Sequence, residues 1–468
     1  MRLLLVYPPV DKSLPSILPE QVEASRGAFP PLGILYLAGE LKKEPGIELS
    51  VIDAPNQNLS NQQIARIVEE KEIELVGMTV LSFHLLDALE LAEKIKERAP
   101  KVKIIVGGPH PHIYPKETLE LGVFDYLVRG EGEEVFCQFV NNLKAGKPEP
   151  AGIISAQNPD QIDNRASIED LDRLEFPARQ MLPIELYHSV LSPRRPITTA
   201  ISSRGCPYQC IFCDRPHLGK KFRARSAKNV VEEMEKCLEL GIKEVVFYDD
   251  NFTTIRERVL EIAELILERK LKISWDIRAR VGDLKKEDYL LLKKAGLERI
   301  HFGVESGDER LLEIIRKGIT LEEARSAFLW ARQAGIETLA YFMLGLPGES
   351  RETISKTISF AKELKPDYVH FSLLMLFPAT PVYQMALERG IIEKDLWGEF
   401  ARNPTPDFQP PLWEENLKGE ELVKALHTAY KKFYLRGSYL FQRLIRTRSF
   451  SGLLHQAKMA GAIFGLGK

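Results

Sequence analysis

The sequence predicts an α/β chain with two modules in tandem, a doubly wound parallel sheet followed by a partial barrel of six βα units. Short apolar runs alternate with helical patterns over residues 1–145 and again over residues 191–390. Between these stretches, over residues 146–190, prolines interrupt the rhythm and mark a linker. With 468 residues, 44% of them hydrophobic, the chain is long enough to build both cores.

Five strands are expected in the first module, because its apolar runs are too short for stable helices and end at Pro, Gly or polar residues. They cover residues 3–7, 49–52, 75–78, 104–106 and 126–128. Helical patterns separate them, most clearly over residues 85–98, where the apolar residues form one stripe. Strands that alternate with helices imply a parallel sheet, and such sheets bind ligands beyond the carboxyl ends of their strands.

Six strands are expected in the second module, at residues 197–201, 244–248, 273–275, 299–302, 338–343 and 368–372. Six βα units fit a partial (β/α)6 barrel, whose chemistry lies at the carboxyl ends of its strands. Residues 391–468 are assigned to a basic, helical C-terminal extension.

Composition excludes several functional classes. The chain has 64 Lys and Arg against 66 Asp and Glu, so its charge gives no reason to expect nucleic acid as a partner. No apolar run reaches the roughly 18 residues of a membrane span. The first run stops at Pro8-Pro9, too early for a signal peptide. Five cysteines are too few for a disulfide framework, and the chain is expected to be cytoplasmic.

The C-terminal tail has a composition of its own. Residues 427–468 carry eight Lys or Arg, no Asp or Glu, and the aromatic residues Tyr430, Phe433, Tyr434, Tyr439, Phe441, Phe450 and Phe464. Three interpretations stay open: a helical cap over the barrel, a site for an acidic partner, and a basic aromatic helix in peripheral contact with an anionic membrane. The membrane interpretation would favour a lipid-like substrate.

Three cysteines form the sharpest motif, Cys206-x3-Cys210-x2-Cys213, directly after the first strand of the second module. Three thiolates can bind three irons of a cubane [4Fe–4S] cluster and leave the fourth iron open. A zinc site is the alternative, with His217 as a fourth ligand. The spacing and the position after a strand favour the cluster. Cys137 and Cys237 lie on apolar helical faces and are interpreted as core residues.

This motif resembles that of the radical S-adenosylmethionine (SAM) enzymes. In that family SAM chelates the open iron and is cleaved to a 5′-deoxyadenosyl radical. The resemblance implies catalytic roles for the three cysteines and SAM contacts at the strand ends, namely Phe212, Asp249, Arg280, Glu305, Ser306 and Leu346. One departure concerns the end of the second strand, residues 248–252, which is acidic and lacks the family's common Gly-Gly-Glu form.

The first module resembles the Rossmann-like, flavodoxin-type cobalamin-binding domain that precedes many radical SAM domains. It has no Gly-x-Gly-x-x-Gly loop after its first strand, which disfavours a dinucleotide. The motifs that carry the resemblance lie at residues 29–38, 79–81, 107–110 and 129–133. It implies cobalamin contacts at Tyr7, Pro8, Thr79, Leu81, Ser82, Gly107, Gly108, Pro109 and Glu131.

One part of the cobalamin pattern is missing. The cobalt-ligating Asp-x-His-x-x-Gly motif is expected near Asp53, but Pro55 and Asn58 stand in place of its His and Gly. The resemblance therefore implies a base-off cobalt without a histidine ligand. A first domain that keeps the fold and has lost the cofactor is the alternative.

Together the motifs favour a cobalamin-dependent radical SAM enzyme of the class B methyltransferase type, whose relatives include anaerobic magnesium-protoporphyrin cyclase and hopanoid methylase. Such an enzyme would methylate an unactivated carbon through a 5′-deoxyadenosyl radical and methylcobalamin. Cyclisation or rearrangement, and a cobalamin-free radical SAM enzyme, are the alternatives within the superfamily. A non-catalytic, membrane-associated metal-binding scaffold is the alternative from another class. The expected partners are a small-molecule or lipid-like substrate and a low-potential electron donor such as flavodoxin or ferredoxin.

Overall fold

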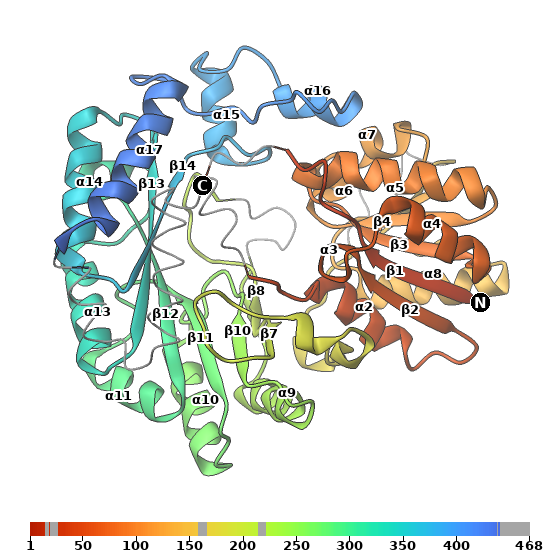
Figure 1. The fold of residues 1–468 in the computed structure, drawn as a ribbon, viewed down its shortest axis with the longest axis horizontal. Coiled ribbons are helices and arrows are strands. Elements are labelled where there is room, and N and C mark those ends of the chain that lie inside the picture. The colour runs from red at the N-terminus through yellow and green to blue at the C-terminus, as the bar shows by residue number, and fades with distance from the viewer. Residues whose placement is uncertain (15–17, 19–26, 158–165, 214–220, 438, 440–468) are drawn as a thin grey trace.

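A computed structural model describes the chain except for residues 15–17, 19–26, 158–165, 214–220, 438 and 440–468. Two six-stranded sheets lie side by side, and each is covered by helices (Figure 1). The α/β fold with two parallel-sheet modules confirms the predicted fold class.

The first sheet has the strand order β2-β1-β3-β4-β5-β6. Its five parallel strands are those predicted, and the order of these five is the flavodoxin-like order. A sixth, antiparallel strand at the edge comes from the segment assigned to the linker and was not predicted. The bounds are β1 (Arg2–Tyr7), β2 (Glu48–Asp53), β3 (Leu75–Thr79), β4 (Lys103–Gly107), β5 (Tyr126–Val128) and β6 (Ile153–Ser155).

Helices cover both faces of this sheet because its strands alternate apolar side chains between two cores. Leu3 and Leu5 face the core under α2 and α8, whereas Leu4 and Val6 face the core under α4 and α5. The helical elements are α2 (Leu32–Leu41), α3 (Ala54–Gln57), α4 (Asn61–Glu70), η1 (Ser82–His84), α5 (Leu85–Arg98), α6 (Pro109–Ile113), α7 (Pro115–Glu120) and α8 (Glu133–Ala145).

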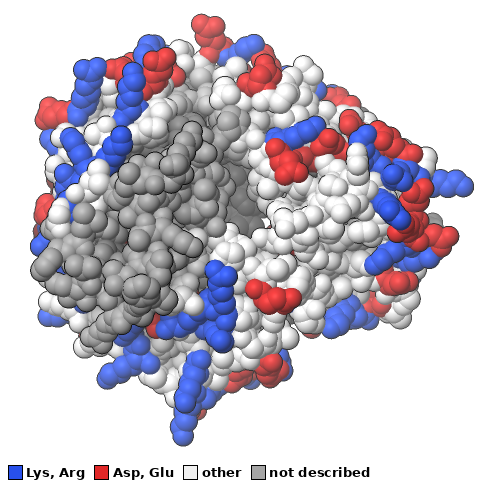
Figure 2. Space-filling model, in the orientation of Figure 1, with Lys and Arg blue, Asp and Glu red and all other residues white. Residues whose placement is uncertain are grey.

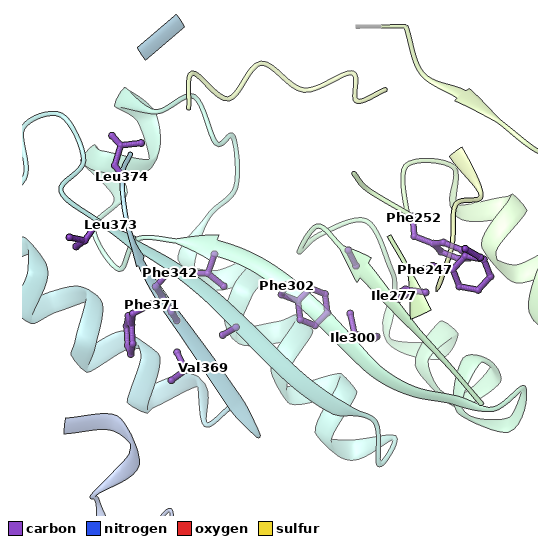
Figure 3. Packing of buried hydrophobic residues seen from close by; sticks show 14 of the residues in the cluster. Phe247, Phe252, Ile277, Ile300, Phe302, Phe342, Val369, Phe371, Leu373 and Leu374 are labelled. Carbon is purple, nitrogen blue, oxygen red and sulfur yellow. The ribbon is translucent and has the colours of Figure 1, made fainter. Parts of the chain in front are cut away.

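The second sheet is parallel throughout, with the order β14-β13-β12-β11-β10-β7, which confirms the six predicted barrel strands. They are β7 (Ile197–Ala200), β10 (Glu244–Phe247), β11 (Ser274–Ala279), β12 (Leu297–Glu305), β13 (Glu337–Leu344) and β14 (Tyr368–Leu373). The outer helices are α9 (Ala227–Glu239), α10 (Arg256–Glu268), α11 (Lys286–Lys294), α12 (Glu309–Ile314), α13 (Leu321–Gln333) and α14 (Arg351–Leu364). A buried aromatic and aliphatic layer joins strands and helices (Figure 3).

Two short features connect the modules. The linker contains three 3-10 turns, η2 (Leu171–Arg173), η3 (Arg179–Met181) and η4 (Ile184–Leu186). A two-stranded antiparallel hairpin of β8 (Ser203–Arg204) and β9 (Arg223–Ala224) flanks the cysteine motif.

α15 (Pro381–Glu388) ends the segment assigned to the barrel, and the extension forms α16 (Leu396–Arg402) and α17 (Gly419–Tyr434). The hydroxyls of Tyr430 and Tyr434, one helical turn apart, donate to the carbonyls of Phe371 and Val369, both at 2.9 Å. They also accept from the backbone N–H groups of the same two residues, so they pair the open edge of β14. The described part of the tail is therefore a cap on the barrel.

The other tail aromatics divide between described and undescribed residues. Phe433 and Tyr439 are buried against the same cap, and the Tyr439 hydroxyl donates to the Asp367 carbonyl at 3.0 Å. Phe441, Phe450 and Phe464 lie outside the described residues. Over the described part of the chain, no helix is both long enough and apolar enough to cross a bilayer.

Candidate functional site

The cysteine loop begins directly after β8, at the carboxyl end of the barrel. Cys206, Cys210 and Cys213 are partly exposed cysteines that form no disulfide with one another. The backbone of Ile211, between them, donates to the Ile315 carbonyl at 3.1 Å and accepts from the Val382 N–H at 2.9 Å. These two bonds tie the loop to the end of α12 and the start of α15.

The thiols fit a cubane better than a single metal ion. Across the described residues, no three His, Cys, Asp or Glu side chains converge on one point as a zinc ion requires. A cubane has no such need, because each of its three thiolates binds a different iron. His217, the fourth ligand in the zinc alternative, lies outside the described residues.

Buried ion pairs fasten the cysteine loop to the first domain. Arg204, two residues before Cys206, donates to Glu131 at 2.9 Å and to Glu133 at 2.5 Å. From the other hairpin strand, Arg223 donates to Glu131 at 2.6 Å. Burial would raise the pKa of Glu131, but Arg223 and Arg204 outweigh it and hold that pKa below its ordinary value. The carboxylate is therefore ionised and joins the two domains.

A cavity of about 260 Å³ opens at the carboxyl end of the first sheet. Its walls come mostly from residues of β1, β3, β4, β5, α2 and α8, while Ile201 and Arg204 reach it from the barrel. Five residues expected to contact cobalamin line it, namely Thr79, Gly107, Gly108, Pro109 and Glu131. Tyr7, Pro8, Leu81 and Ser82, also expected to make this contact, are not among its lining residues.

Two glycines shape this cavity. Gly108 has a φ of 105°, and a Cβ there would lie 3.0 Å from Thr79 Oγ1 and from the Val80 carbonyl oxygen. A Cβ on Gly77 would lie 2.7 Å from a methyl of Leu5. Gly77 and Gly108 therefore let the backbone itself, without side chains, form part of the cavity wall. An apolar cavity bounded by backbone fits the nucleotide tail of a cobalamin.

The loop after β2 carries no imidazole, as the sequence indicates. Asp53 is buried, and its Oδ2 accepts from the Tyr187 hydroxyl at 2.9 Å and from the Asn56 amide at 2.8 Å. Burial raises the pKa of Asp53 against the effect of these hydrogen bonds. Of the histidines near the cavity, His110 bonds Ser82 Oγ at 3.0 Å, and burial lowers its pKa to about 3. His110 is therefore neutral.

Three of the six predicted SAM contacts lie close to the cysteine loop. Arg280 stacks on the ring of Tyr208 with its guanidinium carbon 3.9 Å from the centroid. It donates to the carbonyls of Lys317 and Gly318, the latter at 2.6 Å. Glu305 accepts from Lys317 Nζ at 2.7 Å, and that ammonium lies 6.0 Å from the ring centroid of Phe212.

The other three predicted SAM contacts have side chains buried inside the protein. Asp249 accepts from the Ser202 N–H and hydroxyl and from the Ser203 hydroxyl, at 2.8, 2.6 and 2.5 Å. Ser306 accepts from the Asp308 N–H at 3.1 Å, and Leu346 is 1% exposed. The hydrogen bonds of Asp249 and Ser306 stay within or between the loops at the strand ends.

Comparison with known proteins assigns the family. Residues 200–361 match the Radical SAM superfamily and residues 22–140 match the B12 binding domain. An uncharacterized methyltransferase of Pyrococcus horikoshii is 31% identical over 458 residues, which cover 96% of both chains. The anaerobic magnesium-protoporphyrin IX monomethyl ester cyclase of Cereibacter sphaeroides is 29% identical over 88% of this chain and 68% of its own length.

A solved structure shares the whole fold. The radical SAM methyltransferase TsrM of Kitasatospora setae, solved with cobalamin and a [4Fe–4S] cluster, superposes with a TM-score of 0.73. The superposition covers 100% of both chains at 17% identity. This chain belongs to the radical SAM enzymes that carry a B12-binding domain. Its cofactors are a [4Fe–4S] cluster, SAM and cobalamin.

For this radical SAM enzyme, the residues that sequence reasoning missed are those that join its two cofactor domains. Arg204, Arg223 and Glu133 carried no predicted role, yet they build the buried ion pairs behind the cysteine loop. A signal was present, because Arg204 and the Glu131/Glu133 pair are charges beside otherwise apolar strand ends. Their pairing was hidden because the partners lie more than 70 positions apart.

Proposed function

We propose that this radical SAM enzyme is a C-methyltransferase that acts on an unactivated carbon of a small organic substrate. One observation carries the proposal: the cavity of the B12-binding domain is lined from both domains, and its wall residue Arg204 leads directly into the cysteine loop. A vestigial first domain gives no reason for a cavity shared with the barrel. When bound, the cluster and SAM supply a hydrogen-abstracting radical, and cobalamin supplies the methyl group.

The chain itself binds, positions and shields the reacting groups. Cys206, Cys210 and Cys213 would hold the cluster, while Phe212 and the Lys317–Glu305 pair would flank SAM. Arg280 braces the loop through Tyr208. Holding reactants in a fixed geometry replaces a bimolecular encounter and so lowers the barrier.

The cluster assignment is tested by replacing all three cysteines with alanine and measuring iron after anaerobic reconstitution. The wild-type protein should hold about four irons and cleave SAM under strong reductant, and the triple variant should do neither. Cys137→Ala is the matched control, because that thiol lies on α8 with its Sγ 3.3 Å from Glu44 Oε1. Iron retained by the triple variant would refute the assignment.

Cobalamin binding is tested at Gly108. Gly108→Ala places a methyl against Thr79 and Val80, so the cobalt retained after reconstitution with hydroxocobalamin should fall at least tenfold. Gly122→Ala is the control, because Gly122 also has a positive φ, 77°, but has open space around its Cβ position. Equal cobalt in both variants would favour the cobalamin-free alternative.

An isotope label in the methyl group of SAM distinguishes methyl transfer from cyclisation. With SAM carrying a trideuterated methyl, a methylated product formed from a small-molecule cell extract should gain about 17 mass units and consume two SAM. A product without the label would assign the chain to cyclisation or rearrangement, the activity type of the magnesium-protoporphyrin relative.

We further propose a cytoplasmic location and a low-potential donor, flavodoxin or ferredoxin, that reduces the cluster. A location in the cytoplasm fits five cysteines of which none forms a disulfide, since disulfides are rare there. Peripheral membrane contact through residues 427–468 is a separate possibility for the tail. Flotation of the full chain and of a chain ending at residue 439 with anionic liposomes tests it, and equal flotation would remove the tail from this role.

A further inference from the structure

The inner face of the barrel carries polar side chains on five neighbouring strands. Apolar residues of these strands, among them Phe247, Ile277, Phe342 and Phe371, pack outward under the helices (Figure 3). The alternate positions face inward and remain partly accessible in most cases. From β10 to β14 they are Tyr248, which directly follows its strand, Arg278, His301, Tyr341 and His370.

Arg278 is the cation of this group. Its guanidinium carbon lies 3.9 Å from the ring centroid of Tyr248, and it hydrogen-bonds the hydroxyl of Tyr341. In the described part of the chain, no carboxylate lies within 4.0 Å of it. Asp276 attracts Arg278 electrostatically without forming an ion pair with it, and Asp276 Oδ2 is already bonded to Arg299 and His301. The guanidinium of Arg278 therefore keeps donors that no carboxylate of the described residues occupies. The position is therefore suited to an anion from outside the chain.

The polar side chains around Arg278 are hydrogen-bonded to one another. Tyr341 lies 3.0 Å from His301 Nδ1, and His301 Nε2 lies 3.2 Å from Asp276 Oδ2. Burial would raise the pKa of Asp276, but His301, Arg299 and Arg278 outweigh it and hold that pKa below its ordinary value. The two ring nitrogens of His301 bridge the Asp276 carboxylate and the Tyr341 hydroxyl. Tyr341 in turn can accept from Arg278, which fixes the guanidinium.

The depth of Arg278 separates it from the cysteine loop. Arg299 closes the amino-terminal end of the lumen by donating to Glu337 and to the Leu191 carbonyl, at 2.8 and 2.5 Å. At the other end Arg280 stacks on Tyr208 of the cysteine loop. Arg278 precedes Arg280 by two residues, about 6.6 Å along a strand. It lies between the closed floor and the loop that holds the cluster.

We propose that this cluster is a substrate subsite in which Arg278 binds an oxyanion, a carboxylate or a phosphate, of an acidic organic substrate. This inference rests on the proposed function, because it places the substrate in the barrel lumen. Tyr248 offers an aromatic wall beside the charge, and His370 adds a ring that meets Tyr341 at 5.6 Å between centroids. Figure 2 shows a hollow beside the first domain, and described residues without charge border it on that side. A wholly apolar lipid does not match these groups.

The test uses the reconstituted holoenzyme with SAM and three probes of one size, benzoate, phenylphosphonate and benzamide, followed by saturation-transfer NMR. We expect at least one oxyanion probe to bind at least tenfold tighter than neutral benzamide. Preference between benzoate and phenylphosphonate then distinguishes a carboxylate from a phosphate group. Benzamide binding as tightly as both anions would overturn the inference, and this comparison needs no variant.

Variants locate the site. Arg278→Gln should weaken binding of the oxyanion probe at least tenfold. Arg278→Lys should retain part of the binding, because lysine keeps the positive charge but lacks the planar guanidinium that binds an oxyanion through two hydrogen bonds. Arg269→Gln is the control, because Arg269 pairs with Glu235 on the outer helices. Unchanged probe binding by Arg278→Gln would overturn the inference.

A second readout separates this inference from the proposed function. Iron content and SAM cleavage without substrate should stay unchanged in Arg278→Gln, because the proposed role does not involve SAM. Loss of SAM cleavage in that variant would assign Arg278 to the SAM carboxylate and overturn the subsite, while the methyltransferase proposal would stand. Absence of SAM cleavage in the wild type would instead remove the proposed function.

Discussion

The two edges of the open barrel are closed by different chemistry. On the β7 side, Arg204 and Arg223 pair with Glu131 and Glu133 of the first domain, and all four side chains are at most 8% exposed. On the β14 side, tyrosine hydroxyls of the C-terminal cap pair with backbone groups. We call the contact made by Arg204, Arg223, Glu131 and Glu133 the charged seam, and the contact made by Tyr430 and Tyr434 with β14 the tyrosine seam, which is neutral.

The difference follows from what each seam has to position. A buried ion pair adds little stability over an apolar contact, because both charges lose their hydration. Its geometry is nevertheless specific, since bidentate guanidinium–carboxylate bonds fix both angle and distance. The charged seam stands directly before Cys206 and beside the B12-domain cavity, where two cofactor sites must keep a set distance. The tyrosine seam only has to cover a strand edge.

The largest expected effect comes from breaking the charged seam. Glu131→Gln leaves Arg204 and Arg223 without one of their buried anions, and this should lower the free energy of unfolding by about 3–5 kcal/mol. Chemical denaturation of the purified protein measures it. Glu169→Gln is the control, since Glu169 is an exposed partner of Lys221. A loss as small as that of the control would mean that the seam is not what joins the domains.

The second effect tests an ionisable group in the loop after β13, which the segment before α17 contacts through the hydrogen bond from Asn416 to the Glu349 carbonyl. Burial raises the pKa of Glu349 to about 7, although the N–H groups of Leu346 and Gly345 bond to it. Between its unfolded pKa and about 7 the folded state holds a proton that the unfolded state has lost. Stability should therefore fall by an order of 2–3 kcal/mol as the pH rises from 5 to 8.

Glu349→Gln keeps the shape of the protonated acid and should remove this part of the pH dependence. Urea denaturation at several pH values between 5 and 8 gives the measurement. Glu352→Gln, at a carboxyl that is 79% exposed on α14, should leave the pH dependence as in the wild type. The same slope in all three proteins would show that Glu349 does not titrate in this window.

The comparison of the seams also shows what the sequence could predict. The parallel strands and the cysteine motif depend on local patterns, and the structure confirms those strands. The charged seam depends on pairs such as Arg204 with Glu131, 73 residues apart, which no local pattern reveals. Likewise, alternation along β11 and β13 puts Arg278 and Tyr341 on one face, but only the register between strands brings them together.

The tyrosine seam could be predicted from the sequence in part. Tyr430 and Tyr434 are spaced i, i+4, so a helix places them on one face, and a cap over the barrel was one of the interpretations of the tail that the sequence left open. That their hydroxyls would bond to β14 required knowing which strand is the open edge. Asp249 and Ser306 stay predicted SAM contacts, and what the sequence could not show for them is that their side chains are buried, because burial depends on which distant residues pack against the loop.

A smaller effect is expected at the tyrosine seam, where no charge is involved. Tyr434→Phe leaves the N–H and carbonyl of Val369 without their hydroxyl partner and should lower the free energy of unfolding by about 1–2 kcal/mol. Tyr126→Phe, in the first sheet, is the matched control. Denaturation curves compare the two, and a loss at Tyr434 as large as that for Glu131→Gln would erase the distinction between the seams.

The smallest effect is expected at an exposed ion pair between α14 and α17, on the surface beside the tyrosine seam. Arg351 pairs with Glu421 of α17 at 2.5 Å, but the Arg351 side chain is 83% exposed. Water screens such a pair, and ordering two long side chains offsets the attraction. Arg351→Ala should therefore leave the unfolding midpoint unchanged within error, at both low and high salt. A clear drop that disappears in high salt would show that charge also holds the C-terminal cap, and the contrast between the two seams would then be one of degree.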